Sequence, residues 1–205
     1  MRADPNIFVP LVMMAMIGTF AFNFSVTVPL LVDGPLGGGT QAFTLLFAVL
    51  SLGSLIGALL TARRVEVTPN HLVRSAAAFG LTMVMLAASP TLLVAFPAAI
   101  ALGLGSMVFM TSSTAIVQLL AGAEYRGRVL AIQSLVFLGS TPIGGPLIGL
   151  ISDRAGPRAA ILAGAASCLV AAAYGARALG GEHADPHDGR GRLALSSARE
   201  GACAL

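Results

Sequence analysis

Charge is scarce in this sequence. Charged residues make up only 10% of its 205 residues, and lysine is absent, so that all twelve basic residues are arginine. A soluble globular chain carries about 25% charged residues. Hydrophobic residues reach 56% of the total. A soluble domain of this length cannot hide so much apolar surface, whereas a bilayer solvates it. The composition therefore excludes a soluble fold and predicts a membrane protein.

The few basic and thiol side chains exclude two further classes. The arginines are scattered between apolar blocks instead of gathering on one face, so the basic balance does not indicate a nucleic-acid partner. The sequence has two cysteines, with Cys168 in an apolar block and Cys203 in a polar tail. This placement does not predict a disulfide framework.

Long apolar runs predict the architecture. A transmembrane helix needs roughly 17 to 25 apolar residues. We expect an all-α membrane protein whose six transmembrane helices form a bundle over residues 1–176, followed by a disordered cytoplasmic tail over residues 177–205. The six runs are Ile7–Val32, Ala42–Ala62, Leu72–Ala88, Leu92–Leu120, Val129–Ile151 and Ala159–Gly175.

The arginines also predict an orientation. Six spans put both termini, the second loop and the fourth loop on one side of the membrane. Ten of the twelve arginines fall on that side, and only Arg154 and Arg158 fall on the other. Positively charged residues stay on the cytoplasmic side. We therefore expect a multi-pass protein of the cell membrane with both termini in the cytoplasm.

No Asp, Glu, Arg or His lies near the centre of any run. An intramembrane ionisable residue would be the default proton relay, so these six spans alone offer no coupling site. No cluster of His, Asp, Glu and Cys at either interface indicates catalysis. We expect no enzyme activity, no cofactor and no metal site, and we interpret the acidic and histidine residues between Glu182 and Asp188 as part of the tail.

The second and fifth runs resemble each other. Residues 52–60 (LGSLIGALL) and residues 138–147 (LGSTPIGGPL) both begin Leu-Gly-Ser. They lie three spans apart, so the likeness would relate two three-helix units of opposite topology. The alternative is coincidence, because small residues are common in membrane helices.

Two stretches carry a family resemblance. Residues 124–129 (EYRGRV) and 137–146 (FLGSTPIGGP) look like the major facilitator superfamily, and more narrowly like the C-terminal half of the branch that includes the bacterial enterobactin exporter. The resemblance runs from Pro5 to Gly175. It implies half of a major facilitator fold, built as an inverted 3+3 repeat, that exports a small molecule by alternating access. One departure is Thr61, which stands where the superfamily's loop motif has Asp.

The resemblance assigns the first and fourth runs to the wall of a central cavity. On the first run, Thr19, Asn23 and Thr27 recur every four residues on one helical stripe. The alternative for Asn23 is an interhelical hydrogen bond of roughly 0.6 to 2 kcal/mol with no substrate contact. The predicted cavity residues are Thr19, Phe20, Asn23, Thr27, Met110 and Thr114.

Other residues suggest moving parts. Glycine and proline in the fifth run predict a bend that is either a rocking hinge or a static kink, with Gly139, Pro142, Gly145 and Pro146 as the hinge residues. Arg126, Arg128 and Gln118 are the candidate gate residues at the cytoplasmic side. The arginines could equally be topology anchors.

These expectations define two functional hypotheses. The first is a transporter half that moves a small molecule across the lipid bilayer together with an N-terminal six-helix half or a second copy. The alternative is a truncated or remnant membrane protein with a structural or regulatory role and no transport of its own.

Overall fold

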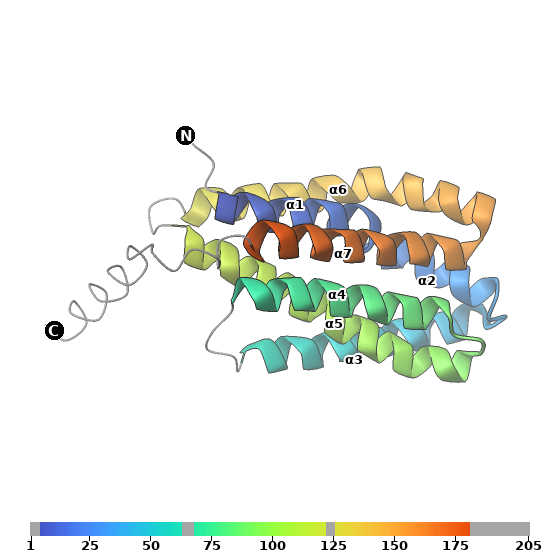
Figure 1. Cartoon of the computed structure of the whole chain (residues 1–205). Coiled ribbons are helices and arrows are strands. Elements are labelled where there is room, and N and C mark those ends of the chain that lie inside the picture. Colours follow the sequence, from blue (N-terminus) through green and yellow to red (C-terminus); the bar gives the residue numbers. More distant parts are fainter. Residues whose placement is uncertain (1–4, 63–67, 122–125, 181–205) are drawn as a thin grey trace, which may run out of the picture.

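The computed structural model describes residues 5–62, 68–121 and 126–180. These residues form helices joined by short turns, and no strand occurs among them (Figure 1). The helices are α1 (Pro5–Phe20), α2 (Phe24–Asp33), α3 (Gly39–Ala62), α4 (Pro69–Ala87), α5 (Leu92–Leu120), α6 (Arg126–Ala155) and α7 (Pro157–Gly180).

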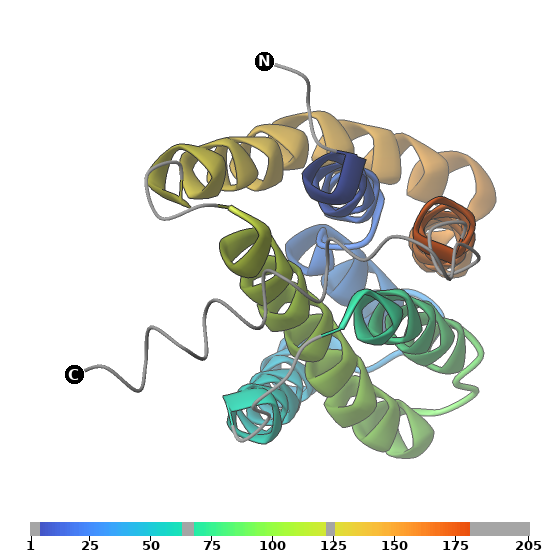
Figure 2. The ribbon, with the colours of Figure 1, turned by 60° about the vertical axis from the view of Figure 1, so that its left-hand side comes forward.

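The helices lie side by side as a bundle of rods (Figure 1). If α1 and α2 are taken together as one rod, six rods alternate in direction, and α1 begins at the same end of the bundle at which α7 ends. The turns α2–α3, α4–α5 and α6–α7 lie at the opposite end. Seen from the other view, α6 arches over α1 while α3 and α5 cross on the far side (Figure 2).

Local sequence explains where the rods begin. Thr68 caps α4, because its side-chain oxygen accepts a hydrogen bond from the His71 N–H at 3.4 Å, and Pro69 takes the first helical position. Gly156 separates α6 from α7 at a φ of 90°, a conformation that favours glycine, and Pro157 then begins α7.

The first predicted span is not one continuous helix. α1 ends at Phe20 and α2 begins at Phe24, so the expectation of a single helix over residues 7–32 is wrong. The backbone of Asn23 has φ −95° and ψ 43°, which lies outside the helical region. The predicted stripe of Thr19, Asn23 and Thr27 therefore spans a break instead of one helical face.

Several predicted ends also shift. α3 begins at Gly39 and not at residue 42, α6 runs from Arg126 to Ala155, and α7 continues through Gly180. Residues 177–180, which the sequence assigned to the tail, are thus helical. The rest of the predicted tail, residues 181–205, lies outside the described residues.

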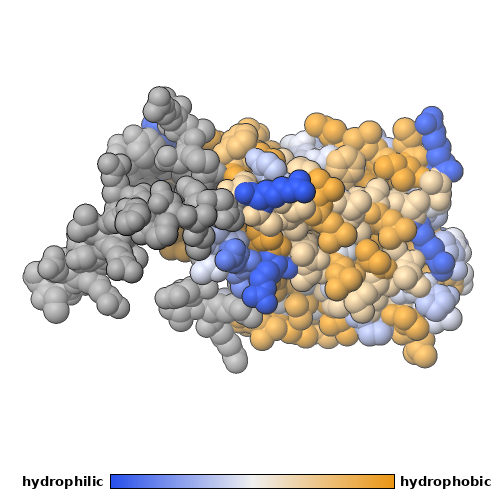
Figure 3. Space-filling model, viewed as in Figure 1, coloured by the Kyte–Doolittle hydropathy of each residue, from blue (hydrophilic) through white to orange (hydrophobic). Residues whose placement is uncertain are grey.

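Among the described residues, five segments are long and apolar enough to cross a membrane, namely 8–33, 39–62, 92–119, 126–155 and 157–178. α4, the third predicted span, is not among them, because its 19 residues are less apolar. It begins with Asn70, His71 and Arg74, yet it lies alongside the other rods. Apolar side chains cover most of the visible outer surface, and hydrophilic residues gather toward its two ends (Figure 3). The chain is therefore a multi-pass membrane protein.

The core lies where α4 and α5 meet α1 and α7. Phe79 and Met83 of α4, Phe109 of α5 and Met13 of α1 are fully buried there. Because lipid tails are as apolar as these side chains, the bundle is held by close van der Waals packing more than by hydrophobic exclusion. Small residues at the helix contacts therefore matter more than total buried area.

Candidate functional site

The break between α1 and α2 is closed by a side chain. The Asn23 Nδ2 donates a hydrogen bond to the Thr19 carbonyl oxygen at 2.7 Å. In a continuous helix, the same oxygen would accept a hydrogen bond from the Asn23 backbone N–H. The Thr27 hydroxyl donates to the Asn23 carbonyl at 3.1 Å, so the first turn of α2 is tied to the same residue. Asn23 is only 2% exposed. Its amide thus satisfies a backbone carbonyl that the break deprives of its helical donor.

Glycines let neighbouring helices approach this break closely. A Cβ at Gly144 of α6 would overlap the Thr19 carbonyl and lie 2.8 Å from the Asn23 Nδ2. A Cβ at Gly164 of α7 would lie 2.9 Å from the Phe20 carbonyl oxygen. Both distances are shorter than real Cβ contacts, so a larger residue would push the helices apart. The break is therefore enclosed by α6 on one side and α7 on another.

Two phenylalanines next to Asn23 anchor the break in an aromatic cluster. The Phe22 ring centroid lies 5.3 Å from that of Phe79 on α4 and 5.2 Å from that of Phe137 on α6. The Phe24 ring packs on Phe79 at 6.2 Å. Phe79 in turn stacks on Phe109 of α5 at 6.4 Å. Aromatic contacts at these distances are favourable, so the broken segment is fixed against α4 and α6 directly and against α5 through Phe79.

A groove opens between α5 and α6, with one residue of α1 at its side. Its volume is about 220 Å³. The predicted cavity residues Met110 and Thr114 line it from α5. The described residues that line it are Met14, Met110, Thr114, Leu130, Gln133, Ser134, Phe137 and Leu138.

One polar pair crosses the groove. The Gln133 Nε2 of α6 donates to the Thr114 Oγ1 of α5 at 3.1 Å. The Thr114 hydroxyl donates its own proton to the Met110 carbonyl at 3.0 Å. Gln133 is 4% exposed, and its Oε1 is buried without a hydrogen-bond partner. A buried polar atom without a partner is uncommon and calls for an explanation.

A second depression continues from the groove along α5. It is lined by Met107, Met110, Thr111, Thr114, Ala115 and Gln118. These positions recur at three- and four-residue intervals and so share one helical face. The predicted gate residue Gln118 lies at its end and is half-buried. Met110 and Thr114 belong to both hollows.

The structure thus divides the predicted cavity residues into two groups. Met110 and Thr114 line the groove, whereas Thr19, Phe20, Asn23 and Thr27 belong to the α1–α2 break and are not among the lining residues. Sequence reasoning missed Met14 and Gln133. The signal for Gln133 was available, because it is an amide eight residues inside a membrane helix, where an unpaired polar group is costly.

The predicted hinge residues all lie within α6, which is helical throughout. Pro142 and Pro146 are exposed on the outside of the bundle, and nothing lies within 4 Å of a Cβ built at Gly139. Gly145 is half-buried next to Asn23. Each proline leaves a helix carbonyl without its usual donor, and such sites are where helices bend.

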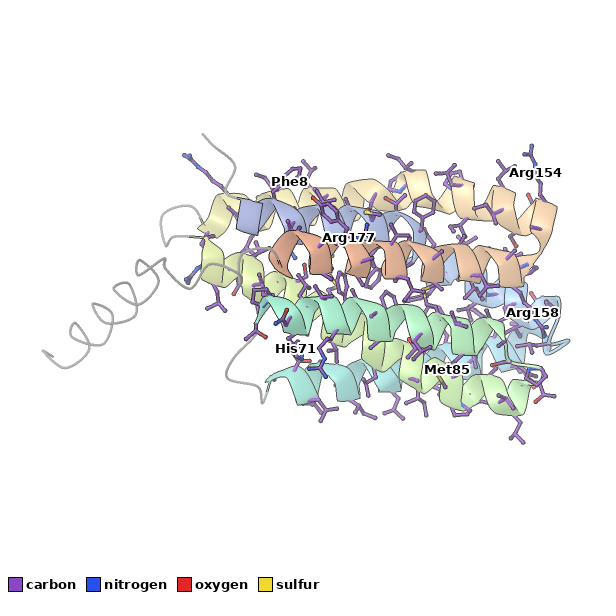
Figure 4. All side chains as sticks on the ribbon, in the orientation of Figure 1. Phe8, His71, Met85, Arg154, Arg158 and Arg177 are labelled. Atoms are coloured by element: carbon purple, nitrogen blue, oxygen red, sulfur yellow. The ribbon has the colours of Figure 1, made fainter. Side chains whose placement is uncertain are left out.

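The charged side chains lie toward the ends of the rods. Arg154 and Arg158 lie at the end where α6 meets α7, and Arg158 donates to the Ser89 carbonyl at 3.0 Å (Figure 4). Arg177 and His71 lie toward the opposite end. The predicted gate residues Arg126 and Arg128 are exposed in the first turn of α6.

Within the described residues, no group of three or more His, Cys, Asp or Glu is placed to hold a metal ion. The residues between Glu182 and Asp188 lie outside the described part of the chain. The site therefore consists of neutral polar groups and apolar side chains.

Comparison with known families gives one match. The family model described as "Transmembrane secretion effector", a family of the major facilitator superfamily, matches residues 1–185. No curated protein matches the chain.

Proposed function

We propose that this chain, which belongs to the transmembrane secretion effector family of the major facilitator superfamily, forms one six-helix half of an exporter. The molecules exported in this proposal are small and amphipathic. The family is one of membrane transport proteins, which are generally not enzymes. In our proposal the half resembles the C-terminal half of the enterobactin-exporter branch, lies in the cell membrane with both ends cytoplasmic, and carries a tail beyond the last helix.

An inverted 3+3 repeat is supported by the packing pattern. Let α1–α2, α3 and α4 form the first unit, and α5, α6 and α7 the second. The extensive contacts are α3 with α5, α1 with α6, α4 with α5, α1 with α7, and α4 with α7. Exchanging the two units puts α5 in the place of α1–α2, α6 in the place of α3 and α7 in the place of α4. The α3–α5 contact then becomes the α6–α1 contact, and the α4–α5 contact becomes the α7–α1 contact. The α4–α7 contact is unchanged. This is the pattern expected of two repeats related by a two-fold axis in the membrane plane.

Glycine contacts follow the same exchange. A Cβ at Gly57 of α3 would lie 2.8 Å from the Leu104 carbonyl oxygen of α5, and a Cβ at Gly103 of α5 would overlap the Leu50 carbonyl of α3. At the α1–α6 contact, a Cβ at Gly144 would overlap the Thr19 carbonyl of α1, whereas a Cβ at Gly18 would lie 2.7 Å from the Ser140 side-chain oxygen. A glycine that lets backbone approach backbone lies at both equivalent interfaces, which favours a true repeat over the chance likeness of two glycine-rich segments.

The observation that carries the transport proposal is the hollow face of α5. Met110, Thr114 and Gln118 lie on it and are only half-buried, while the groove beside it holds the buried Gln133 amide. The amide of the half-buried Gln118 would be poorly satisfied if it faced lipid, so this face is better suited to a water-filled cavity or to a second half. Transporter sites commonly lie where two repeated halves meet, and in this proposal the hollow face of α5 faces the other half.

The partner in this proposal is an N-terminal six-helix half or a second copy of the chain. Each half supplies one wall of an alternating-access cavity. Arg126, exposed at the start of α6, would latch the cytoplasmic side by pairing with a carboxylate of the other half, with Arg128 and Gln118 nearby. Pro142 and Pro146 would let α6 flex as the halves rock, with the glycines at residues 139 and 145 easing the bend.

The test is transport in reconstituted vesicles. The purified chain, alone and together with an N-terminal six-helix half, is assayed for removal of the dye Hoechst 33342 from the bilayer under a proton gradient. Thr114→Phe fills the groove and should lower the rate several-fold. Leu93→Phe is the matched control, because Leu93 is 82% exposed on the same helix.

The outcomes separate the two functional hypotheses. Transport that appears with the second half and falls in Thr114→Phe alone supports the proposal. If no combination moves the dye, or any other labelled amphipathic compound, above empty vesicles, the exporter is rejected and the alternative of a membrane protein without transport of its own replaces it.

A further inference from the structure

The Gln133 side chain holds an acceptor for which no residue in the described part of the chain provides a donor. Its Oε1 is buried without a hydrogen-bond partner, and the residue lines the groove between α5 and α6. An unsatisfied acceptor in such a place lowers stability. An apolar side chain at this position would avoid that loss, so the presence of the amide points to a use for its unpartnered oxygen.

The hydrogen bonds around Gln133 distinguish its two amide atoms. The Thr114 hydroxyl donates its proton to the Met110 carbonyl at 3.0 Å. With its proton so placed, the Thr114 oxygen accepts from the Gln133 Nε2 at 3.1 Å. Turning the amide over would require the Thr114 hydroxyl to leave the Met110 carbonyl and donate to the Gln133 Oε1 instead. Thr114 thus acts as a positioning residue that holds Nε2 and leaves the buried Oε1 without a partner.

The surroundings of this oxygen are apolar and uncharged. Met14, Met110, Leu130 and Phe137 line the groove, and none of the described lining residues is ionisable. A carboxylate ligand would find no cation here, and an ammonium ligand would find no anion, so burying either charge would be costly. The two methionines have flexible, polarisable side chains that adapt to ligands of different shape.

We propose that Gln133 is a specificity-determining residue of this groove, and that the groove takes neutral, mainly apolar molecules that present one hydrogen-bond donor to the Gln133 Oε1. The inference rests on the proposed function, because it names the substrate class of the same cavity. The groove's 220 Å³ is smaller than a whole ligand site of about 300 to 1,000 Å³, so it accommodates one part of the substrate and the second half encloses the remainder.

Two probes that differ in a single donor test this proposal. N-phenyl-1-naphthylamine is a neutral aromatic molecule with one N–H, and its N-methyl derivative has none. Binding of both tritiated probes to the full chain in lipid nanodiscs is measured by scintillation proximity, with empty nanodiscs as the background. The wild-type chain should bind the N–H probe about fivefold to a hundredfold more tightly than the N-methyl probe.

The matched variants are Gln133→Met, which keeps the length of the side chain without an acceptor, and Gln41→Met, at an exposed position of α3. Gln133→Met should abolish the preference while still binding the N-methyl probe. Gln41→Met should keep the preference. Gln133→Leu serves as a second variant if Gln133→Met folds poorly. Either variant should unfold at the same temperature as the wild type or at a higher one, because a buried unsatisfied acceptor has been removed.

Equal binding of the two probes by the wild-type chain would overturn the donor preference, and so would a preference that survives in Gln133→Met. Binding of neither probe by the wild type would also overturn it. Each of these results leaves the vesicle assay free to succeed, whereas failure of all transport with an intact donor preference would reject the exporter and keep the binding site.

Discussion

The main chain of Thr19 lies directly against Gly144, so that the carbonyl oxygen of Thr19 occupies the place where a Cβ of residue 144 would be. Thr19 belongs to the last turn of α1 and Gly144 to the middle of α6. The same carbonyl accepts the hydrogen bond from the Asn23 side chain at 2.7 Å. The break in the first rod and the close packing of α6 are therefore one structural feature.

Gly144→Ala should destabilise the bundle strongly. The added methyl group would meet backbone, which cannot move aside, so we expect a loss of about 1 to 3 kcal/mol in the free energy of unfolding. Gly149→Ala in the same helix is the control, because nothing lies within 4 Å of a Cβ at that position. Unfolding in mixed micelles, titrated with dodecyl sulfate and followed by circular dichroism, measures both. Equal stability of the two variants would show that the Thr19–Gly144 contact is not tight.

Asn23→Ala distinguishes a structural hydrogen bond of this amide from a contact with substrate. The variant loses the bond to the Thr19 carbonyl and leaves that oxygen buried, so we expect it to lower the free energy of unfolding by about 1 to 3 kcal/mol. Thr44→Val is a control, since Thr44 bonds its own helix on the exposed side of α3. Unchanged stability together with an altered KM in the vesicle assay would instead favour a substrate contact.

Phe22→Ala should be among the more damaging single changes in the aromatic cluster. Its ring contacts Phe24, Phe79 and Phe137, and losing a packed phenylalanine costs about 3 to 5 kcal/mol in a core. We expect the lower part of that range because Phe22 is half-buried. Phe8→Ala is the control, because the Phe8 side chain is 52% exposed (Figure 4). Thermal unfolding in detergent should rank Phe22→Ala well below Phe8→Ala.

Much of the architecture follows from apolar periodicity. Five of the six predicted spans coincide with segments that can cross a membrane, and the superfamily resemblance is confirmed by the family match. Hydropathy could not detect the break at Asn23, because Phe22 and Phe24 keep the run apolar while the backbone leaves the helix. The break depends on tertiary contacts with Gly144 and Gly164, which no local pattern contains.

The candidate site was predictable only in part. The position of the fourth run in the family pattern pointed to Met110 and Thr114, and both line the groove. Gln133 lies in a run whose most prominent feature is its glycine and proline residues, so that pattern does not single it out. Its pairing with Thr114 depends on which sides of α5 and α6 face each other. The packing of α5 on α3 and of α6 on α1, both at glycines, helps to determine those sides.

The predicted orientation can be tested with the two native cysteines. Cys168 is fully buried in α7 and should not react, so Cys203 in the tail is the reporter. If the arginine-rich end is cytoplasmic, a membrane-impermeant maleimide added to intact cells should leave Cys203 unlabelled, and permeabilisation should expose it. Arg154→Cys in a Cys203→Ala background is the opposite control. Arg154 is exposed at the end where α6 meets α7, so it should label in intact cells. Labelling of Cys203 from outside, with Arg154→Cys protected, would reverse the predicted topology.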